Sequence, residues 1–287
     1  MIITNKQNLP EAFLKYATEG NREYKEHRYS VTELLLPVRE ILLNRKHAHE
    51  IESDVADTIP ALFGTAVHNI LEQYAPILET DVKAEESVEA VFGDDIIAGR
   101  IDLLNLASES IEDYKTCSVS KVMKQDFEDW RLQGLAYALL VFKQKNIVIR
   151  HLKFYALMKD WSKIKSATAS NYPSSAIYVW KYDIQDSDYD YIEEYLKQKL
   201  NWIRLYLEAD SLPECTDEEK WYTGTKYAVF KNVGDKRAAI VCDTEEEAHG
   251  FITNKCGGSG EIEVRKGEYL KCKYYCNCCK FCEKRGE

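Results

Sequence analysis

Two aspartates and a lysine in the middle of the chain have the spacing of a divalent-metal site. Asp102 lies in an Ile- and Leu-rich segment, 96–105, and Asp113 and Lys115 lie in a second such segment, 110–116. A short turn-like stretch separates the two segments, which predicts a β-hairpin. If that turn closes an antiparallel pair, Asp102 faces Asp113, with Cβ atoms about 4.5–5.5 Å apart.

This arrangement favours a bound metal ion over an ordinary polar surface. Side chains alternate along a strand, so Asp113 and Lys115 point to the same face. Two carboxylates held side by side repel each other unless a cation lies between them, and hard divalent ions prefer oxygen ligands. The pattern therefore predicts a Mg²⁺ or Mn²⁺ site. The alternative interpretation is a surface hairpin with scattered charges.

The elements that must position these residues form a sheet covered by helices. Ser30 and Glu33 have the spacing of a capping box, which predicts a helix that runs to about Asn44. The order of helical and strand-like segments is typical of a mixed α/β core. Apolar spacing predicts further helices at 62–74, 126–143 and 188–207, and further strands at 88–92, 147–157 and 176–182.

The sequence changes character after residue 210. Segments 227–232 and 237–242 flank a Gly- and Asp-containing turn, which predicts a second hairpin. A helix capped by Thr244 and a strand at 261–264 follow, so this region is expected to form a small ββαβ module. The chain is therefore divided into a core with an N-terminal helical region (1–210), the ββαβ module (211–270) and a cysteine-rich tail (271–287).

Four short motifs resemble, in order and spacing, those of the RecB-like nucleases of the PD-(D/E)XK superfamily, a group that includes phage and CRISPR-adaptation exonucleases. The resemblance covers roughly residues 29–157 and the cysteine-rich tail. It implies a PD-(D/E)XK, restriction-endonuclease-like core and metal-dependent cleavage of DNA phosphodiesters. The motifs are GTAVH at 64–68, GRID at 99–102, DYK at 113–115 and QGLAY at 133–137.

The resemblance implies a role for individual residues of the predicted hairpin and of the helix before it. Asp102 and Asp113 would be metal ligands, Lys115 the catalytic lysine and His68 an additional metal ligand. A metal held by carboxylates makes hydroxide available near neutral pH, and a lysine beside it would orient that water or offset charge on the phosphate. The imidazole nitrogen of His68 favours Mn²⁺ over Mg²⁺.

The resemblance also implies DNA contacts and one more acidic ligand. Gln133 and Tyr137 match a motif associated with DNA binding, although they could equally form the polar edge of a packed helix. An acidic residue upstream of the GRID segment often completes such sites. Glu85, Glu86 and Glu89 are candidates for this acidic residue. Glu89 and Glu85 are preferred only slightly, because no fixed spacing decides among the three.

Nine cysteines are unevenly distributed along the chain. Five of them lie within residues 272–282, and such density predicts thiolate ligation of a structural metal in a reducing compartment. Cys117 and Cys242 lie in apolar strands and are expected to be small core residues. The alternative for the cysteine-rich tail is a set of free thiols.

Some relatives hold a [4Fe–4S] cluster with one remote cysteine and a C-terminal C-x₂-C-x₅-C group. Here Cys276 and Cys282 keep the last interval, but Cys272 lies one residue further from Cys276 than in those relatives. No cysteine precedes Cys117, so Cys215 is the best substitute for the remote ligand. The expected ligands are Cys215, Cys272, Cys276 and Cys282, with Cys278 and Cys279 as rivals, and Zn²⁺ and [4Fe–4S] remain equal alternatives.

Composition limits the classes of function that fit. The net charge of −10 counts against a simple nucleic-acid binder, although residues 265–287 hold seven Lys or Arg against three Asp or Glu. No segment resembles a membrane span or a signal peptide, so a cytoplasmic protein of a bacterium or a phage-infected cell is expected.

The expected function is a metal-dependent DNA nuclease, an exonuclease and not a sequence-specific endonuclease, in phage or bacterial replication, recombination or repair. DNA is the expected partner, and a recombination or replication protein is a candidate second partner. The alternative is a weak or inactive DNA-binding or assembly partner in recombination or CRISPR adaptation. A third interpretation is an interaction protein whose cysteine-rich tail is the functional part.

Overall fold

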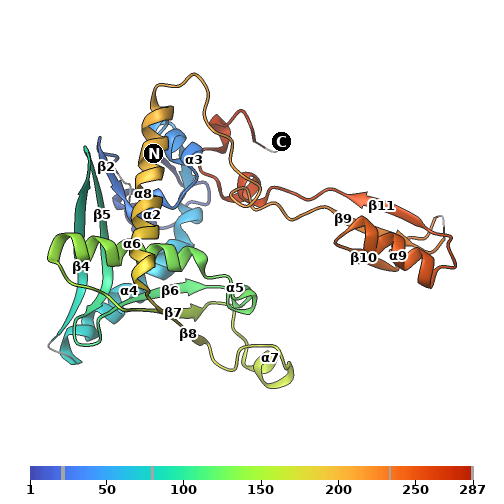
Figure 1. The fold of residues 1–287 in the computed structure, drawn as a ribbon, viewed down its shortest axis with the longest axis horizontal. Coiled ribbons are helices and arrows are strands. Elements are labelled where there is room, and N and C mark those ends of the chain that lie inside the picture. Colours follow the sequence, from blue (N-terminus) through green and yellow to red (C-terminus); the bar gives the residue numbers. More distant parts are fainter. Residues whose placement is uncertain (21–22, 79–80, 233, 286–287) are drawn as a thin grey trace. The chain divides into compact units, whose positions relative to one another are not determined.

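The computed structural model describes residues 1–20, 23–78, 81–232 and 234–285 (Figure 1). The chain divides into two compact units, Met1–Leu212 and Pro213–Glu287. The first unit contains the predicted hairpin and the second contains the ββαβ module with the cysteine-rich tail. In the described residues, no helix is both long enough and apolar enough to cross a membrane.

The first unit is built around a mixed six-stranded sheet. Its strands follow the order β2-β5-β6-β7-β8. Strand β4 pairs with β5 along the edge of β5 that is opposite to β2 and β6. The β2–β5 and β6–β7 pairs are parallel and the other pairs are antiparallel. The strands are β2 (Arg28–Ser30), β4 (Val82–Phe92), β5 (Asp95–Asn105), β6 (Ser110–Cys117), β7 (His151–Met158) and β8 (Ile177–Asp183).

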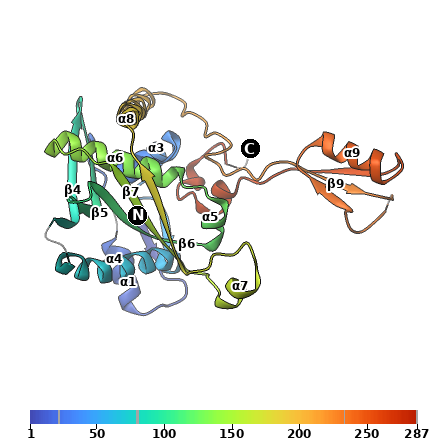
Figure 2. The same ribbon diagram turned by 60° about the horizontal axis from the view of Figure 1, so that its bottom comes forward.

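Helices cover both faces of this sheet. Helix α4 (Ile59–Leu78) lies on one face, and α6 (Glu128–Lys145) and α8 (Asp186–Leu207) lie on the other (Figure 2). Residues 134–141 of α6 are all buried, because this helix packs between the sheet and α8. Shorter elements complete the unit: β1 (Ile2–Thr4), α1 (Glu11–Glu19), α2 (Val31–Leu34), α3 (Val38–Lys46), β3 (Glu52–Asp54), α5 (Val119–Lys124) and α7 (Lys163–Thr168).

The prediction of one continuous helix from Ser30 to about Asn44 is wrong, because the structure has two helices there. Its capping box is present, since Ser30 accepts a hydrogen bond from the Glu33 backbone and the Glu33 side chain accepts one from Ser30. Helix α2 nevertheless ends after one turn, and α3 begins directly after Pro37. Proline lacks a backbone N–H and disfavours the helical conformation of the residue before it, so it separates the two helices.

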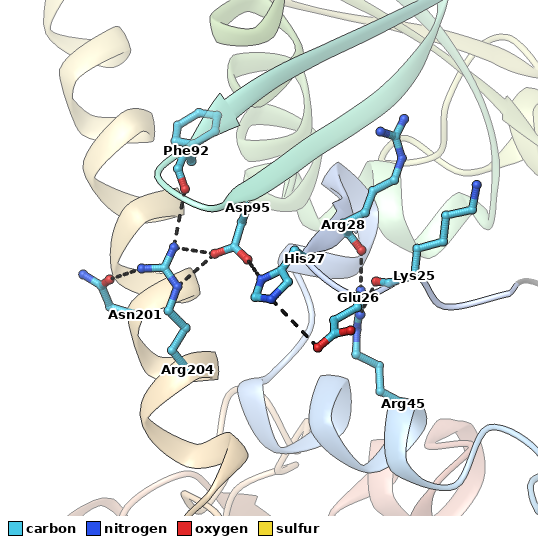
Figure 3. Close-up of polar contacts among 9 residues, drawn as sticks. All are labelled: Lys25, Glu26, His27, Arg28, Arg45, Phe92, Asp95, Asn201 and Arg204. Carbon is cyan, nitrogen blue, oxygen red and sulfur yellow. Dashed lines mark hydrogen bonds and ion pairs between the residues drawn. The ribbon is translucent and has the colours of Figure 1, made fainter.

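A buried ion pair anchors the start of β5 to α8 (Figure 3). Asp95 is 1% exposed and accepts a hydrogen bond from Arg204 Nε at 3.0 Å. Arg204 also donates to the backbone carbonyl of Phe92 at 3.4 Å, and Nδ1 of His27 lies 3.0 Å from the second Asp95 oxygen. These contacts hold the turn between β4 and β5, and therefore the strand that carries the GRID motif.

The second unit contains the small sheet predicted from the sequence. Its strand order is β10-β9-β11, with antiparallel pairs, and a helix packs on it through Val229, Cys242 and Ala248. Thr244 caps that helix, as expected. The elements are β9 (Lys226–Phe230), β10 (Ile240–Cys242), α9 (Glu245–Lys255) and β11 (Glu261–Arg265), followed by a π-helical segment at Lys271–Tyr275 and a 3₁₀ helix at Cys279–Phe281.

Candidate active site

The predicted hairpin has the expected register. Leu103 pairs with Glu112 and Asn105 pairs with Ser110, which places Asp102 next to Asp113 at the point where the ladder ends. There the Asp102 carboxylate accepts a hydrogen bond from the backbone N–H of Tyr114 at 2.8 Å. Where β5 and β6 separate, the Asp102 side chain thus accepts the Tyr114 N–H in place of a backbone carbonyl. This hydrogen bond fixes the orientation of the carboxylate.

Strand β4 adds a third acid to this pair. Ala84 pairs with Leu103 and Glu86 pairs with Ile101, so Glu85 lies opposite Asp102. Glu85 has a φ of +51°, in the left-handed region that non-glycine residues rarely adopt. Glu85, Asp102 and Asp113 therefore form a row across three neighbouring strands, which we term the acid row.

The acid row lies where the sheet opens. On one edge of β5, β2 pairs with residues 96–98 and β6 pairs with residues 103–105, so Gly99–Asp102 lies between the two ladders. A cavity of about 480 Å³ is located at this opening. Its lining residues are mostly polar: Ser30, Thr32, Thr65, His68, Asn69, Glu85, Arg100, Asp102 and Tyr137, with Val31, Gly64 and Gly99.

Three side chains at this cavity fit a divalent cation. One potential ligand atom from each of His68, Glu85 and Asp102 lies within 4.8 Å of the other two. His68 reaches the strands from α4, and its Nδ1 lies 3.2 Å from Asp102 Oδ2. Two carboxylates and an imidazole are a donor set suited to Mn²⁺ and acceptable to Mg²⁺.

The electrostatics of the two aspartates show how closely they are held. Burial raises the pKa of Asp113 to about 7; the Lys115 charge opposes this rise, and the charge and hydrogen bond of Asp102 add to it. Burial also tends to raise the pKa of Asp102, but hydrogen bonds from His68, Asp113 and the Tyr114 backbone hold it below its usual value. Without a cation, the two carboxyl groups thus favour a shared proton.

Each acid of the row also has its own cationic neighbour. Arg100 forms an ion pair with Glu85, and Lys115 forms one with Asp113. The hydrogen bond to Asp102 raises the pKa of His68, which favours the charged imidazolium. The fold therefore brings three acids together by surrounding them with three basic groups.

Arg100 and the polar cavity residues Thr65 and Asn69 had no role assigned from the sequence. The sequence could have indicated Arg100 as a site residue. It lies two residues before Asp102, and alternation along β5 places both side chains on one face. On α4, Thr65 lies three residues before His68 and four before Asn69, which is the spacing of side chains on one side of a helix.

The two motif glycines near α6 are explained by close packing. A Cβ on Gly99 would clash with the ring of Tyr137, and a Cβ on Gly134 would come within 2.6 Å of Leu152. Tyr137 lines the cavity, and its hydroxyl accepts a hydrogen bond from Gln133 Nε2 at 3.1 Å. The predicted pair on α6 is thus connected to the site through Tyr137.

The other upstream glutamates are engaged elsewhere. Glu89 lies opposite Ala98, four residues along β4 from Glu85, and its carboxylate pairs with Arg28 at 2.6 Å. Glu86 pairs with Lys145 at 2.7 Å. Of the three candidates, Glu85 has its carboxylate in the group with His68 and Asp102.

The cysteines of the tail lie in the second unit. The Sγ atoms of Cys276 and Cys278 are 3.5 Å apart, and Cys278 is 1% exposed. Cys272 and Cys279 line a cavity of about 700 Å³. Cys242 is buried in the core of the ββαβ module, and Cys117 is half-buried at the end of β6.

Several solved structures resemble this chain, and exonucleases are among them. The structure of SSO0001 has a TM-score of 0.50 at 14% identity and covers 74% of this chain and 89% of its own. A phage-related exonuclease from Haemophilus somnus 129PT has a TM-score of 0.36 at 14% identity, over 61% of this chain and 82% of its own.

The alkaline exonuclease LHK-Exo from Laribacter hongkongensis has a TM-score of 0.35 at 9% identity and covers 63% of this chain and 90% of its own. No protein-family model and no curated protein sequence matches the chain. The likeness to SSO0001 shows a shared fold.

Proposed function

We propose that this chain is a divalent-metal-dependent DNA nuclease, an exonuclease that hydrolyses phosphodiesters in phage or bacterial DNA replication, recombination or repair. The observation that carries the proposal is the acid row with His68 on one side and Lys115 on the other. Exonuclease action, rather than sequence-specific endonuclease action, follows from the motif resemblance.

The residues that would hold the cation are His68, Glu85 and Asp102, with Asp113 directly beside them. A divalent ion bound there would lower the pKa of a coordinated water and polarise the scissile phosphate. Mg²⁺ and Mn²⁺ both accept this donor set. Because an imidazole nitrogen suits Mn²⁺ better than Mg²⁺, we expect higher activity with Mn²⁺.

Two basic residues are placed to act on a phosphate. Lys115 lies beside Asp113, with its Nζ 5.6 Å from the centroid of the Phe154 ring, so its charge is held in a partly desolvated position. A fixed cation in such a position stabilises charge that develops on phosphate oxygens. Arg100 has 70% of its side chain exposed at the cavity, where it can bind the neighbouring backbone phosphate once a metal competes for Glu85.

DNA contacts are proposed for the α6 pair. Tyr137 lines the cavity between Gly99 and Asp102, and Gln133 donates to its hydroxyl. A strand that brings a phosphate to the acid row would therefore meet this tyrosine. Because 6% of Tyr137 is exposed, the contact would be limited to the part of the residue that lines the cavity, and Gln133 fixes the orientation of its hydroxyl.

A structural metal is proposed for the second unit. The expected thiolate ligands are Cys215, Cys272, Cys276 and Cys282, and the short distance between the sulfurs of Cys276 and Cys278 supports Cys278 as a replacement for one of them. A visible absorption spectrum of freshly purified protein distinguishes the alternatives, since a [4Fe–4S] cluster absorbs in the visible range and Zn²⁺ does not.

The nuclease proposal is tested with 5′- and 3′-labelled linear DNA, circular DNA and single-stranded DNA in Mg²⁺ or Mn²⁺. We expect linear DNA to be degraded from its ends in the wild type and to remain intact with Lys115→Ala, whose circular dichroism spectrum should be unchanged. DNA binding without cleavage at any metal concentration would instead identify a binding or assembly protein.

A further inference from the structure

Large aromatic side chains are exposed on the second unit. Trp221 is 49% exposed, Tyr274 is 63% exposed and Tyr275 is 64% exposed. The ring centroids of Trp221 and Tyr275 are 5.1 Å apart, with the planes inclined by 55°. These rings lie on the two chain segments that lead into and out of the ββαβ module.

Basic side chains lie among these rings. Lys273 Nζ is 5.2 Å from the ring centroid of Tyr274, and Lys271 Nζ is 5.9 Å from that of Trp221. Lys273 also lines the cavity of about 700 Å³, together with Lys266 and Arg285. Two further tyrosines, Tyr222 and Tyr269, line the same cavity, with ring centroids 4.9 Å apart.

Lys273 links the rings to the cavity, since it lies near Tyr274 and also lines the cavity, and we term this set of residues the aromatic–basic surface. It is defined by Trp221, Tyr274, Tyr275, Lys266, Lys273 and Arg285. Its charge contrasts with that of the whole chain, because residues 265–287 hold seven Lys or Arg against three Asp or Glu in a protein of net charge −10. One acid, Glu268, faces the cavity and pairs with Lys273 at 3.1 Å.

We propose that the aromatic–basic surface binds single-stranded DNA. Exposed rings interleaved with cations match the two chemical features of an unpaired strand, since bases stack on aromatic side chains and phosphates bind lysine and arginine. A duplex hides its base faces, so it offers such a surface only its phosphates. Lysine is depleted at protein–protein interfaces, so the lysines beside the rings favour a nucleic-acid strand over a protein partner.

The choice of DNA over RNA rests on the proposed nuclease function, whereas the preference for unpaired bases rests on the surface itself. The surface would give the protein a second contact with its substrate, from a unit separate from the acid row. It would retain a strand whose end has been opened or shortened.

The test measures binding without cleavage. The full-length Lys115→Ala protein, without added divalent metal, is titrated into fluorescein-labelled oligothymidylate and into a labelled duplex, and anisotropy is recorded. We expect Trp221→Ala combined with Tyr275→Ala to weaken binding of the single strand about tenfold or more, because each lost stacking contact removes a large share of the affinity. Binding of the duplex should change less than twofold.

Matched variants separate stacking from loss of fold. Trp202→Ala removes a tryptophan that is 53% exposed on α8 of the first unit, and it should leave the affinity for the single strand unchanged. Trp221→Phe keeps an aromatic ring and should restore most of the affinity. Trp221 fluorescence, taken as the difference between wild type and Trp221→Phe, should be quenched on binding.

Equal affinities of the wild type and the Trp221→Ala, Tyr275→Ala variant for the single strand would overturn the proposal, as would equal losses for single strand and duplex. Tighter binding to oligouridylate than to oligothymidylate would also overturn it, in favour of RNA. Because no cleavage is measured, a negative result leaves the nuclease proposal intact, and an inactive acid row would not affect this result.

Discussion

Asp95 and Asp113 are both almost completely removed from solvent, with 1% and 3% of the residue exposed, but the charges around them differ. Asp95 is held by two basic groups, Arg204 and His27. Asp113 meets Lys115 on one side and a second carboxylate, Asp102, on the other, and burial raises its pKa to about 7. Both aspartates belong to adjacent strands of one sheet.

The difference shows that burial by itself does not distinguish an acid of the proposed site from a structural one. A buried carboxylate that is satisfied by a delocalised guanidinium contributes to the fold, as Asp95 does by joining the β4–β5 turn to α8 (Figure 3). A buried carboxylate beside a second carboxylate carries an electrostatic cost that a divalent cation would remove. Crowding of like charge is the feature that marks the site.

The largest effect is expected from Asp113→Asn, which should lower nuclease activity by at least about 10²–10³-fold, the loss typical of removing one preorganised charge. The fold should remain intact.

Because the pKa of Asp113 is raised from 3.8 to about 7, its ionisation costs folding free energy, and this cost grows as the pH rises between those values. Without added metal, the variant should therefore gain stability relative to the wild type from pH 4 to pH 8, measured by thermal denaturation. An equal loss of stability at all pH values would show that Asp113 is structural, like Asp95.

The opposite behaviour is expected for Arg204→Ala. Removing Arg204 from this buried ion pair leaves Asp95 with His27 as its neighbour, and the cost should fall near the lower end of about 3–5 kcal/mol because Arg204 is 41% exposed. Urea denaturation measures it. The activity per folded molecule should be unchanged well below the unfolding temperature.

Arg150→Ala is the matched control for Arg204→Ala. Arg150 is similarly exposed at 44%, but its partner Asp186 is 90% exposed, so we expect little change in stability. Equal destabilisation by the two arginine variants would contradict the structural role assigned to the Asp95 pair.

A smaller effect than those above is expected from Glu85→Gln, and Glu89→Gln serves as its control. Glu85 lies in the acid row, whereas Glu89 lies four residues further along the same strand and pairs with Arg28. Loss of one carboxylate ligand should weaken Mn²⁺ binding, measured by isothermal titration calorimetry, by about tenfold or more. Glu89→Gln should leave the Mn²⁺ affinity unchanged, and weaker binding in both variants would mean that Glu85 acts through general charge and not as a ligand.

Much of the fold could be read from local patterns. The β5–β6 register follows from the length of one turn, and the capping box at Ser30 and the Thr244 cap follow from side chains that satisfy nearby backbone N–H groups. The break at Pro37 was open to prediction too, because the proline is visible in the sequence. These features depend on residues within a few positions of one another.

The composition of the site was only partly determined in this way. The sequence by itself determined Asp102, Asp113 and Lys115, because strand alternation and a short turn decide which side chains meet. It did not decide among Glu85, Glu86 and Glu89, since β4 joins β5 in a register that depends on the whole length of both strands. The tertiary structure placed Glu85 opposite Asp102, brought His68 to it from α4 and gave Arg100 and Tyr137 their places at the cavity. Those contacts join residues far apart in the chain, and only the packing of helices on both faces of the sheet brings them together.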